Sequence, residues 1–179
     1  YCMGPGGGIY SYEAKEENQR IARRSLDKLG LSDRIEFKIR DIREGFDETN
    51  IDAIFLDVPN PYDYLVQAKA ALKPGGNFGS IVPTTNQVSY LLTALRQNDF
   101  AFIDVCDISQ RYYKPEPTRF RPTDRMISHT GYLVFARSVS IDHSIADRKL
   151  LKEIGMLGVE ELKSEKESSE NDEIVVLEE

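Results

Sequence analysis

Apolar residues recur along the chain with two different periods, and the period changes from one segment to the next. Segments that are β-branched, aromatic, alternating or continuously apolar predict strands, whereas apolar residues three or four positions apart predict helices. The predicted strands are Ile9–Glu13, Ile35–Ile39, Ile51–Asp57, Asn77–Val82, Phe100–Ile108 and Thr130–Arg137. The predicted helices are Lys15–Leu29, Asp63–Leu72 and Asn86–Gln97.

Strands that alternate with helices predict right-handed βαβ units and a mostly parallel sheet. The last two strands are joined by Ser109–His129 with no helix between them, so they are expected to pair antiparallel. Pro74-Gly75-Gly76 is expected to end a helix in a turn. The pattern therefore predicts an α/β, Rossmann-like fold with an antiparallel last strand. Ligands of such sheets bind beyond the carboxyl ends of the strands.

Charge is distributed unevenly along this chain. The net charge is −7, but residues 141–179 hold 12 acidic and 5 basic side chains, which leaves 18 of each sign in residues 1–140. The neutral part can still carry a local basic face, which phosphate binding requires. We predict a domain over 1–140 and an acidic tail over 141–179 that is partly helical or disordered.

Composition bears on several further classes of protein. No apolar run approaches the ~20 residues of a membrane span. Cys2 and Cys106 make neither a disulfide framework nor a metal box, and His129 and His143 are too few for a histidine-based metal site. We therefore expect a cytoplasmic chain, with no membrane and no metal among its partners.

Acidic residues stand at or just after the carboxyl ends of three predicted strands. These are Glu13, Asp41 and Asp57. In a dinucleotide-like site, an acid at the position of Glu13 accepts hydrogen bonds from ribose hydroxyls. A carboxylate at the position of Asp41 can accept a hydrogen bond from an exocyclic adenine amine. Considered alone, Glu13 also suits a helix N-terminus and Asp41 is better explained as a turn acid.

The sharpest local signal is Asp57-Val58-Pro59-Asn60-Pro61, directly after a nearly continuous apolar strand. Its prolines stiffen the loop and remove two backbone donors, which holds Asp57 rigidly at the ligand edge. A charge there favours a functional role over that of a plain turn acid. The segment 83–87 (PTTNQ) follows the next strand and brings hydroxyls and amides to the same edge, where Thr84 or Thr85 can also cap a helix.

The connection Ser109–His129 interleaves basic and aromatic residues. They are Arg111, Tyr112, Tyr113, Lys114, Arg119, Phe120, Arg121 and Arg125. Cations pair with phosphates and aromatic faces stack on unpaired bases, so the pattern suits RNA. A solvated loop whose aromatics pack on the sheet explains the pattern about as well. His129 stands where the loop rejoins the sheet.

Five segments together make the chain resemble the tRNA (adenine-N1)-methyltransferases of the bacterial and archaeal homo-oligomeric type, and the catalytic subunit of the eukaryotic enzyme. They are GPGGGIYSYE, DRIEFKIRDIREGFDETNIDAIFLDVPNP, ALKPGG, PTTNQV and RFRPTDRMISHTGYLVFAR. The resemblance runs from about Gly4 to Arg137. It implies a class I methyltransferase fold, S-adenosylmethionine as cofactor, and formation of N1-methyladenosine in the T-loop of tRNA. It also implies a cytoplasmic homotetramer.

The same resemblance implies roles for individual residues. It implies that Glu13 holds the ribose of S-adenosylmethionine, that Asp41 binds its adenine amine, and that Ile42 packs on the adenine ring. It implies that Asp57, the catalytic residue, lies between the methyl donor and the target base. The residues implied to contact RNA are Asn60 (often glutamine in the family), Tyr112, Arg121 and His129.

In the family a strand, a Gly-x-Gly-x-Gly loop and a small β domain precede GPGGGIYSYE. Gly4–Gly8 does not replace that loop, because it comes before a strand rather than after one. We therefore expect residues 1–179 to be a fragment that is inactive alone. Two alternatives stay open: a class I methyltransferase that acts on a small molecule or protein, and a non-catalytic tRNA-binding subunit.

Overall fold

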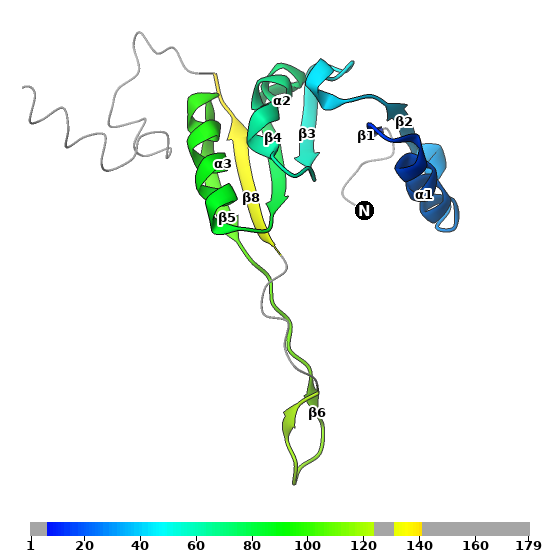
Figure 1. Cartoon of the computed structure of the whole chain (residues 1–179), viewed down its shortest axis with the longest axis vertical. Coiled ribbons are helices and arrows are strands. Elements are labelled where there is room, and N and C mark those ends of the chain that lie inside the picture. The colour runs from blue at the N-terminus through cyan, green and yellow to red at the C-terminus, as the bar shows by residue number, and fades with distance from the viewer. Residues whose placement is uncertain (1–6, 124–130, 141–179) are drawn as a thin grey trace, which may run out of the picture. The chain divides into compact units, whose positions relative to one another are not determined.

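The computed structural model describes residues 7–123 and 131–140. The chain divides between Thr49 and Asn50 into two compact units, each with its own sheet (Figure 1). His129 and residues 141–179 lie outside the described residues. The domain bounds 1–140 and 141–179 therefore stay a prediction.

The first unit is a β–α–β arrangement. It contains β1 (Ile9–Glu13), α1 (Glu16–Asp27), the short 3-10 turn η1 (Ser32–Arg34), β2 (Ile35–Ile39) and a second turn, η2 (Ile42–Glu44). The two strands are parallel, in register from Ile9 opposite Ile35 to Glu13 opposite Ile39. Their carboxyl ends therefore meet at one edge of this sheet.

The second unit is a four-stranded sheet with two helices. Its elements are β3 (Ile51–Leu56), η3 (Pro61–Tyr64), α2 (Leu65–Ala71), β4 (Leu72–Val82), α3 (Thr85–Gln97), β5 (Phe100–Cys106) and β8 (Tyr132–Ser138). The strand order is β3-β4-β8-β5. β3 and β4 are parallel, and β8 runs antiparallel to both β4 and β5. The predicted mostly parallel α/β fold with an antiparallel last strand is confirmed.

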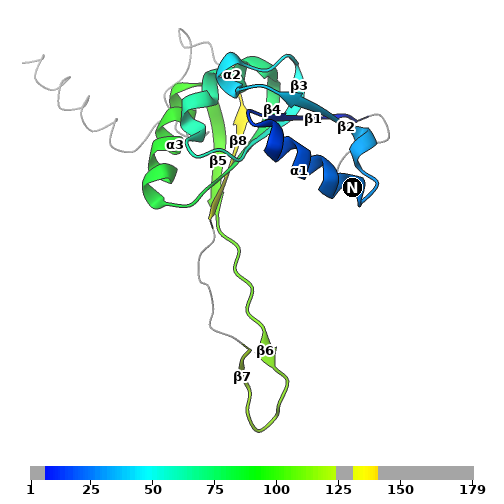
Figure 2. The ribbon, with the colours of Figure 1, turned by 45° about the vertical axis from the view of Figure 1, so that its right-hand side comes forward.

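The core of the second unit lies between its sheet and helices α2 and α3, which lie along the strands in Figures 1 and 2. The largest fully buried apolar side chains are Phe78, Phe100, Leu65, Leu91, Leu95, Val82 and Val134. The rings of Phe78 and Phe100 meet edge to face, with their centroids 5.4 Å apart. Each such side chain contributes about 1.5–3 kcal/mol through the removal of apolar surface from water.

Two segments differ from their sequence prediction. Pro74-Gly75-Gly76 does not form a turn between helix and strand, because β4 already begins at Leu72. The ladder jumps from Ile51 opposite Leu72 to Ala53 opposite Asn77, so the proline and glycines form a bulge inside the strand. Gly75 supplies the positive φ of 78° that this bulge needs.

The connection after β5 also holds a feature that was predicted only as a loop. Tyr113–Lys114 (β6) and Arg121–Pro122 (β7) pair antiparallel and make a small hairpin (Figure 2). The rings of Tyr113 and Phe120 stack within it, 5.0 Å apart and 5° from parallel. We call residues 113–122 the basic hairpin.

Candidate functional site

Glu13 and Asp41 lie at the same edge of the β1–β2 sheet. Glu13 ends β1, its main-chain oxygen accepts from the N–H of Arg40 at 3.0 Å, and Asp41 follows Arg40 directly. Each carboxylate is anchored by a nearby backbone donor: Glu13 Oε1 by the N–H of Lys15 and Asp41 Oδ1 by the N–H of Arg43, both at 2.9 Å. A carboxylate has about four lone-pair positions, so both can accept further hydrogen bonds.

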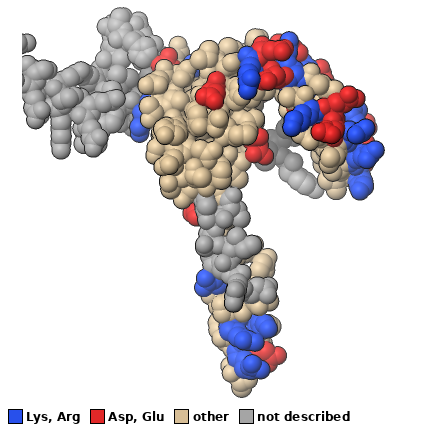
Figure 3. All heavy atoms as spheres, viewed as in Figure 1, with Lys and Arg blue, Asp and Glu red and all other residues tan. Residues whose placement is uncertain are grey.

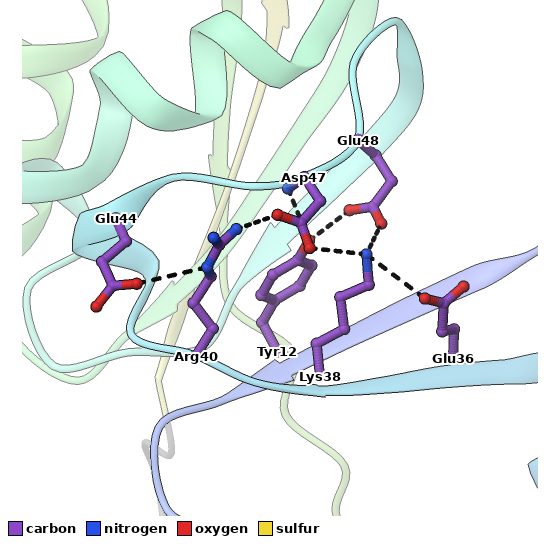
Figure 4. Close-up of polar contacts among 7 residues, drawn as sticks. All are labelled: Tyr12, Glu36, Lys38, Arg40, Glu44, Asp47 and Glu48. Atoms are coloured by element: carbon purple, nitrogen blue, oxygen red, sulfur yellow. Dashed lines mark hydrogen bonds and ion pairs between the residues drawn. The ribbon is translucent and has the colours of Figure 1, made fainter.

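A polar cluster holds the chain just beyond this edge (Figure 4). The Tyr12 hydroxyl donates to Glu48 Oε2 at 2.6 Å and accepts from the N–H of Asp47 at 2.9 Å. Lys38 Nζ donates to Asp47 Oδ2 at 3.0 Å and also pairs with Glu48. Arg40 pairs with Asp47. Tyr12 and Lys38 thus tie the segment after Gly45 to β1, which ends at Glu13, and to β2, which ends two residues before Asp41.

The protonation states within this cluster support one another. The hydrogen bond to Glu48 is the main cause that raises the pKa of Lys38 above its usual value. The hydrogen bond from Lys38 lowers the pKa of Asp47. Burial opposes ionisation of Glu48, but the hydrogen bonds from Lys38 and Tyr12 outweigh it and lower its pKa. Burial, followed by the bond to Glu48, raises the pKa of Tyr12.

In the second unit, Asp57 follows the carboxyl end of β3, and the loop 57–61 is fastened at several points. Pro61 is fully buried. Gln87 on α3 donates from Nε2 to the main-chain oxygen of Pro59 at 2.8 Å. Tyr62 donates from its hydroxyl to Asn60 Oδ1 at 2.9 Å. Asp57 and Asn60 remain exposed on this fastened loop.

The segment 83–87 lies at the same edge, because β4 runs parallel to β3. Thr84 caps α3, since its Oγ1 accepts from the N–H of Gln87 at 3.3 Å and donates to Gln87 Oε1 at 2.8 Å. The capping role predicted for this segment is thus assigned to Thr84. The amide of Gln87 thereby links the start of α3 to the Asp57 loop.

Tyr112 and Arg121 belong to the connection that contains the basic hairpin. Tyr112 is 67% exposed, and its main-chain oxygen accepts from the N–H of Thr123 at 2.9 Å. Arg121 is exposed, and its backbone lies opposite that of Lys114 in the antiparallel pairing of β6 and β7. Figure 3 shows Lys and Arg atoms gathered over this hairpin. The predicted interleaving of cations and aromatics is therefore presented on the surface.

Two other kinds of feature are absent from the residues that the structure describes. Residues 7–123 and 131–140 contain no group of three or more His, Cys, Asp or Glu side chains that could hold a metal ion. No helix within the same ranges is long and apolar enough to cross a membrane.

Several residues that shape these sites were not singled out from the sequence. Tyr12 and Lys38 build the cluster beside Glu13 and Asp41, and Tyr62 and Gln87 fasten the Asp57 loop. The aromatic-polar alternation of IYSYE and IEFKI offered a signal for the first pair, since both side chains stand on strands. The amide in PTTNQ offered one for Gln87.

The fold is that of Rossmann-like class I methyltransferases, with acidic residues at or just after the carboxyl ends of β1, β2 and β3. A solved structure described as an S-adenosylmethionine-dependent O-methyltransferase from Thermotoga maritima is 46% identical, with a TM-score of 0.74 over 78% of this chain and 53% of that one. That of the tRNA (m1A58) methyltransferase TrmI from Aquifex aeolicus is 36% identical, with a TM-score of 0.69 over 75% of this chain and 55% of that one.

The chain belongs to the family described as tRNA methyltransferase complex GCD14 subunit, whose model matches residues 1–120. Among curated relatives, the tRNA (adenine(57)-N(1)/adenine(58)-N(1))-methyltransferase TrmI of Methanocaldococcus jannaschii is 30% identical over 76% of this chain and 57% of that protein. The chain spans about half the length of the curated relatives it matches. The resemblance seen in the sequence is confirmed at the level of the family.

Proposed function

We propose that the protein is an S-adenosylmethionine-dependent tRNA methyltransferase that forms N1-methyladenosine at the T-loop adenine, position 58 in the names of its relatives. The observation that carries this proposal is Asp57, an exposed carboxylate at the carboxyl end of β3, on a loop fastened by Gln87 and Pro61. A tRNA substrate implies work in the cytoplasm, and the family resemblance implies a homotetramer.

The donor set at the β1–β2 edge fits the cofactor. S-adenosylmethionine presents two ribose hydroxyls and an adenine amine, all of them donors, and the edge presents the carboxylates of Glu13 and Asp41. Glu13 would hold the ribose and Asp41 the amine, while half-buried Ile42 offers an apolar surface to the adenine ring. When bound, the cofactor supplies an electrophilic methyl group on its sulfonium.

The residues of the second unit then account for the chemistry. N1 of neutral adenine is a nucleophile, and the purine becomes cationic as the new N1–C bond forms. The Asp57 carboxylate, accepting a hydrogen bond from the exocyclic amine, stabilises that positive charge, and its stiff loop fixes the orientation of the base. A base buried in folded tRNA must be extruded to reach it. Tyr112, Arg121 and His129 would hold the surrounding RNA.

The test is methyl transfer by the full-length gene product to an unmodified tRNA transcript, with N1-methyladenosine quantified by mass spectrometry. We expect Asp57→Asn to lower kcat by about 100-fold, on the order of what the loss of one preorganised charge-stabilising group costs. Asp63→Asn, on the neighbouring η3 turn, is the matched control and should retain activity. Equal activity of both variants would remove Asp57 from the reaction.

A second candidate function rests on the Thermotoga maritima structure, whose description names an O-methyltransferase. In that case the fold and cofactor stay the same and the acceptor is a hydroxyl group on a small molecule. Cofactor binding without methylation of any tRNA would favour this candidate. Cofactor binding by isothermal titration calorimetry is therefore measured alongside methylation.

A further inference from the structure

The side chain of Asn60 has a defined orientation, and the orientation determines what it can offer a ligand. Its Oδ1 accepts from the Tyr62 hydroxyl at 2.9 Å. A carboxamide has one acceptor oxygen and one NH₂ group with two donors. With its oxygen engaged, Asn60 offers its Nδ2 donors to a bound molecule.

Tyr62 is itself supported. Its ring packs edge to face on Tyr90 of α3, with centroids 5.7 Å apart and planes 67° apart. Pro61, the residue before it, is fully buried. On the other side of Asn60, the oxygen of Pro59 is held by Gln87. The backbone of Asn60 is therefore held on both flanks, and its side-chain amide is held by Tyr62, which packs against α3.

Asn60 lies three residues after Asp57 on a loop whose two prolines restrict its backbone. A carboxylate and an amide donor three positions apart on one stiff loop suit one edge of adenine. That edge carries the N6 amine, a donor, beside N7, an acceptor. The alternative acceptor N3 lies beyond N1 as seen from N6, so reaching it would bring the loop across the atom that receives the methyl group.

We propose that this loop recognises the target adenine along its N6–N7 edge, with Asp57 accepting from N6 and Asn60 donating to N7. N1 then stays open to the methyl donor. Tyr62 acts as a positioning residue, because its hydroxyl keeps the donor side of the Asn60 amide available. Guanine carries an acceptor oxygen in place of the amine and is repelled by Asp57. This inference rests on the proposed function and adds how the base is read.

The experiment uses the full-length gene product and two ligated tRNAs that differ only at the target nucleotide, adenosine or 7-deazaadenosine. The analogue replaces N7 by a C–H and leaves N1 and N6 in place. For each enzyme we measure kcat and KM, and compare kcat/KM for the two tRNAs. Asn60→Ala reports the intrinsic effect of the analogue, because it has neither donor nor acceptor at this position.

For each enzyme, the effect of the analogue is the ratio of kcat/KM for the adenosine tRNA to kcat/KM for the 7-deazaadenosine tRNA. We expect this ratio to be about tenfold larger for the unmodified enzyme than for Asn60→Ala, which is the scale of one lost hydrogen bond in a recognition site. Asn60→Asp keeps the acceptor for Tyr62 but removes the donor, so it should favour the analogue over adenosine. Tyr62→Phe should lower kcat/KM for adenosine about threefold and reduce the discrimination against the analogue. Tyr64→Phe, on the same turn, is its matched control.

Two results would overturn this inference and leave the proposed function intact. One is normal methylation by the unmodified enzyme that is indifferent to N7, and the other is a Tyr62→Phe variant that behaves as Tyr64→Phe does. A different result, no N1-methyladenosine from the adenosine tRNA despite cofactor binding, overturns the proposed function and the inference with it.

Discussion

The hydroxyl of Ser80 on β4 donates a hydrogen bond of 2.8 Å to the main-chain oxygen of Leu56, the last residue of β3. Ser80 is fully buried and Leu56 is 4% exposed. Asp57 follows Leu56 directly, so this bond fixes the point at which β3 ends and the loop 57–61 begins. A polar side chain in the core thereby serves to define the geometry at the ligand edge.

Replacing Ser80 by alanine should destabilise the protein by about 1–2 kcal/mol, because the buried Leu56 oxygen loses a hydrogen bond. Urea unfolding of the full-length protein measures the change. Ser89→Ala is the control: its hydroxyl donates to Thr85 O at 3.2 Å on the exposed side of α3, and its loss should stay within about 0.5 kcal/mol. Similar losses for the two variants would mean that burial of the Ser80 bond has no energetic importance.

Gly76 lies in the bulge of β4 in a space that excludes a side chain. A Cβ atom there would lie 2.9 Å from the main-chain oxygen of Lys73 and 2.9 Å from Leu72 Cδ2. Since the backbone oxygen cannot move without distorting the bulge, Gly76→Ala should cost about 1–3 kcal/mol in the free energy of unfolding.

Gly8→Ala is the matched control for this glycine, because a Cβ at Gly8 would have nothing within 4 Å. Thermal unfolding of the two variants provides the comparison. A melting temperature of Gly76→Ala no lower than that of Gly8→Ala would show that the bulge can rearrange.

The sequence predicted those parts of the fold in which a local pattern decides the structure. The bounds of β1 and β2 agree with Ile9–Glu13 and Ile35–Ile39, because a short aromatic and β-branched run after glycines and a short apolar-polar alternation both favour a strand. The bulge in β4 could not be predicted in this way. Pro and Gly are common just after a helix end, but here β4 pairs with β3 on either side of Pro74-Gly75-Gly76.

The candidate site divides in the same manner. The acids at strand ends were predictable, since the apolar runs fix where each strand stops. The contacts that position them were not, because they join distant segments: Tyr12 meets Glu48 36 positions away, and Gln87 meets Pro59 28 positions away. Such contacts depend on the path of a loop, and loops carry no periodicity from which a path can be read.

Arg121 provides a test of the basic hairpin as an RNA contact. If it pairs with a phosphate, Arg121→Gln should weaken tRNA binding and reduce the dependence of log Kd on log salt by about one. Filter binding over about 50–200 mM salt measures both quantities. Arg20→Gln on α1, also exposed, is the control. An unchanged salt slope in Arg121→Gln would exclude a phosphate contact by this residue.

The cluster around Glu48 predicts a specific response to acid. Because the pKa of Glu48 is lower in the folded protein than the usual 4.5, the unfolded chain binds more protons between these two values. The free energy of unfolding should therefore fall as the pH drops through that window, and the stability that Glu48 contributes is fully present above it. Asp47, whose pKa is also lowered, acts in the same direction.

Glu48→Gln removes this titration but keeps an oxygen acceptor for Lys38 or Tyr12. The variant should be less stable than the unmodified protein near neutral pH, and should lose less stability between about pH 7 and pH 3. Urea unfolding at several pH values measures both changes. Glu36→Gln, which removes a more exposed carboxylate 3.5 Å from Lys38, should keep the acid sensitivity of the unmodified protein. If Glu48→Gln keeps the same acid sensitivity, the hydrogen bonds of Glu48 do not stabilise its charged form. The negative charge of Glu48 would then contribute nothing to holding the segment beside Glu13 and Asp41.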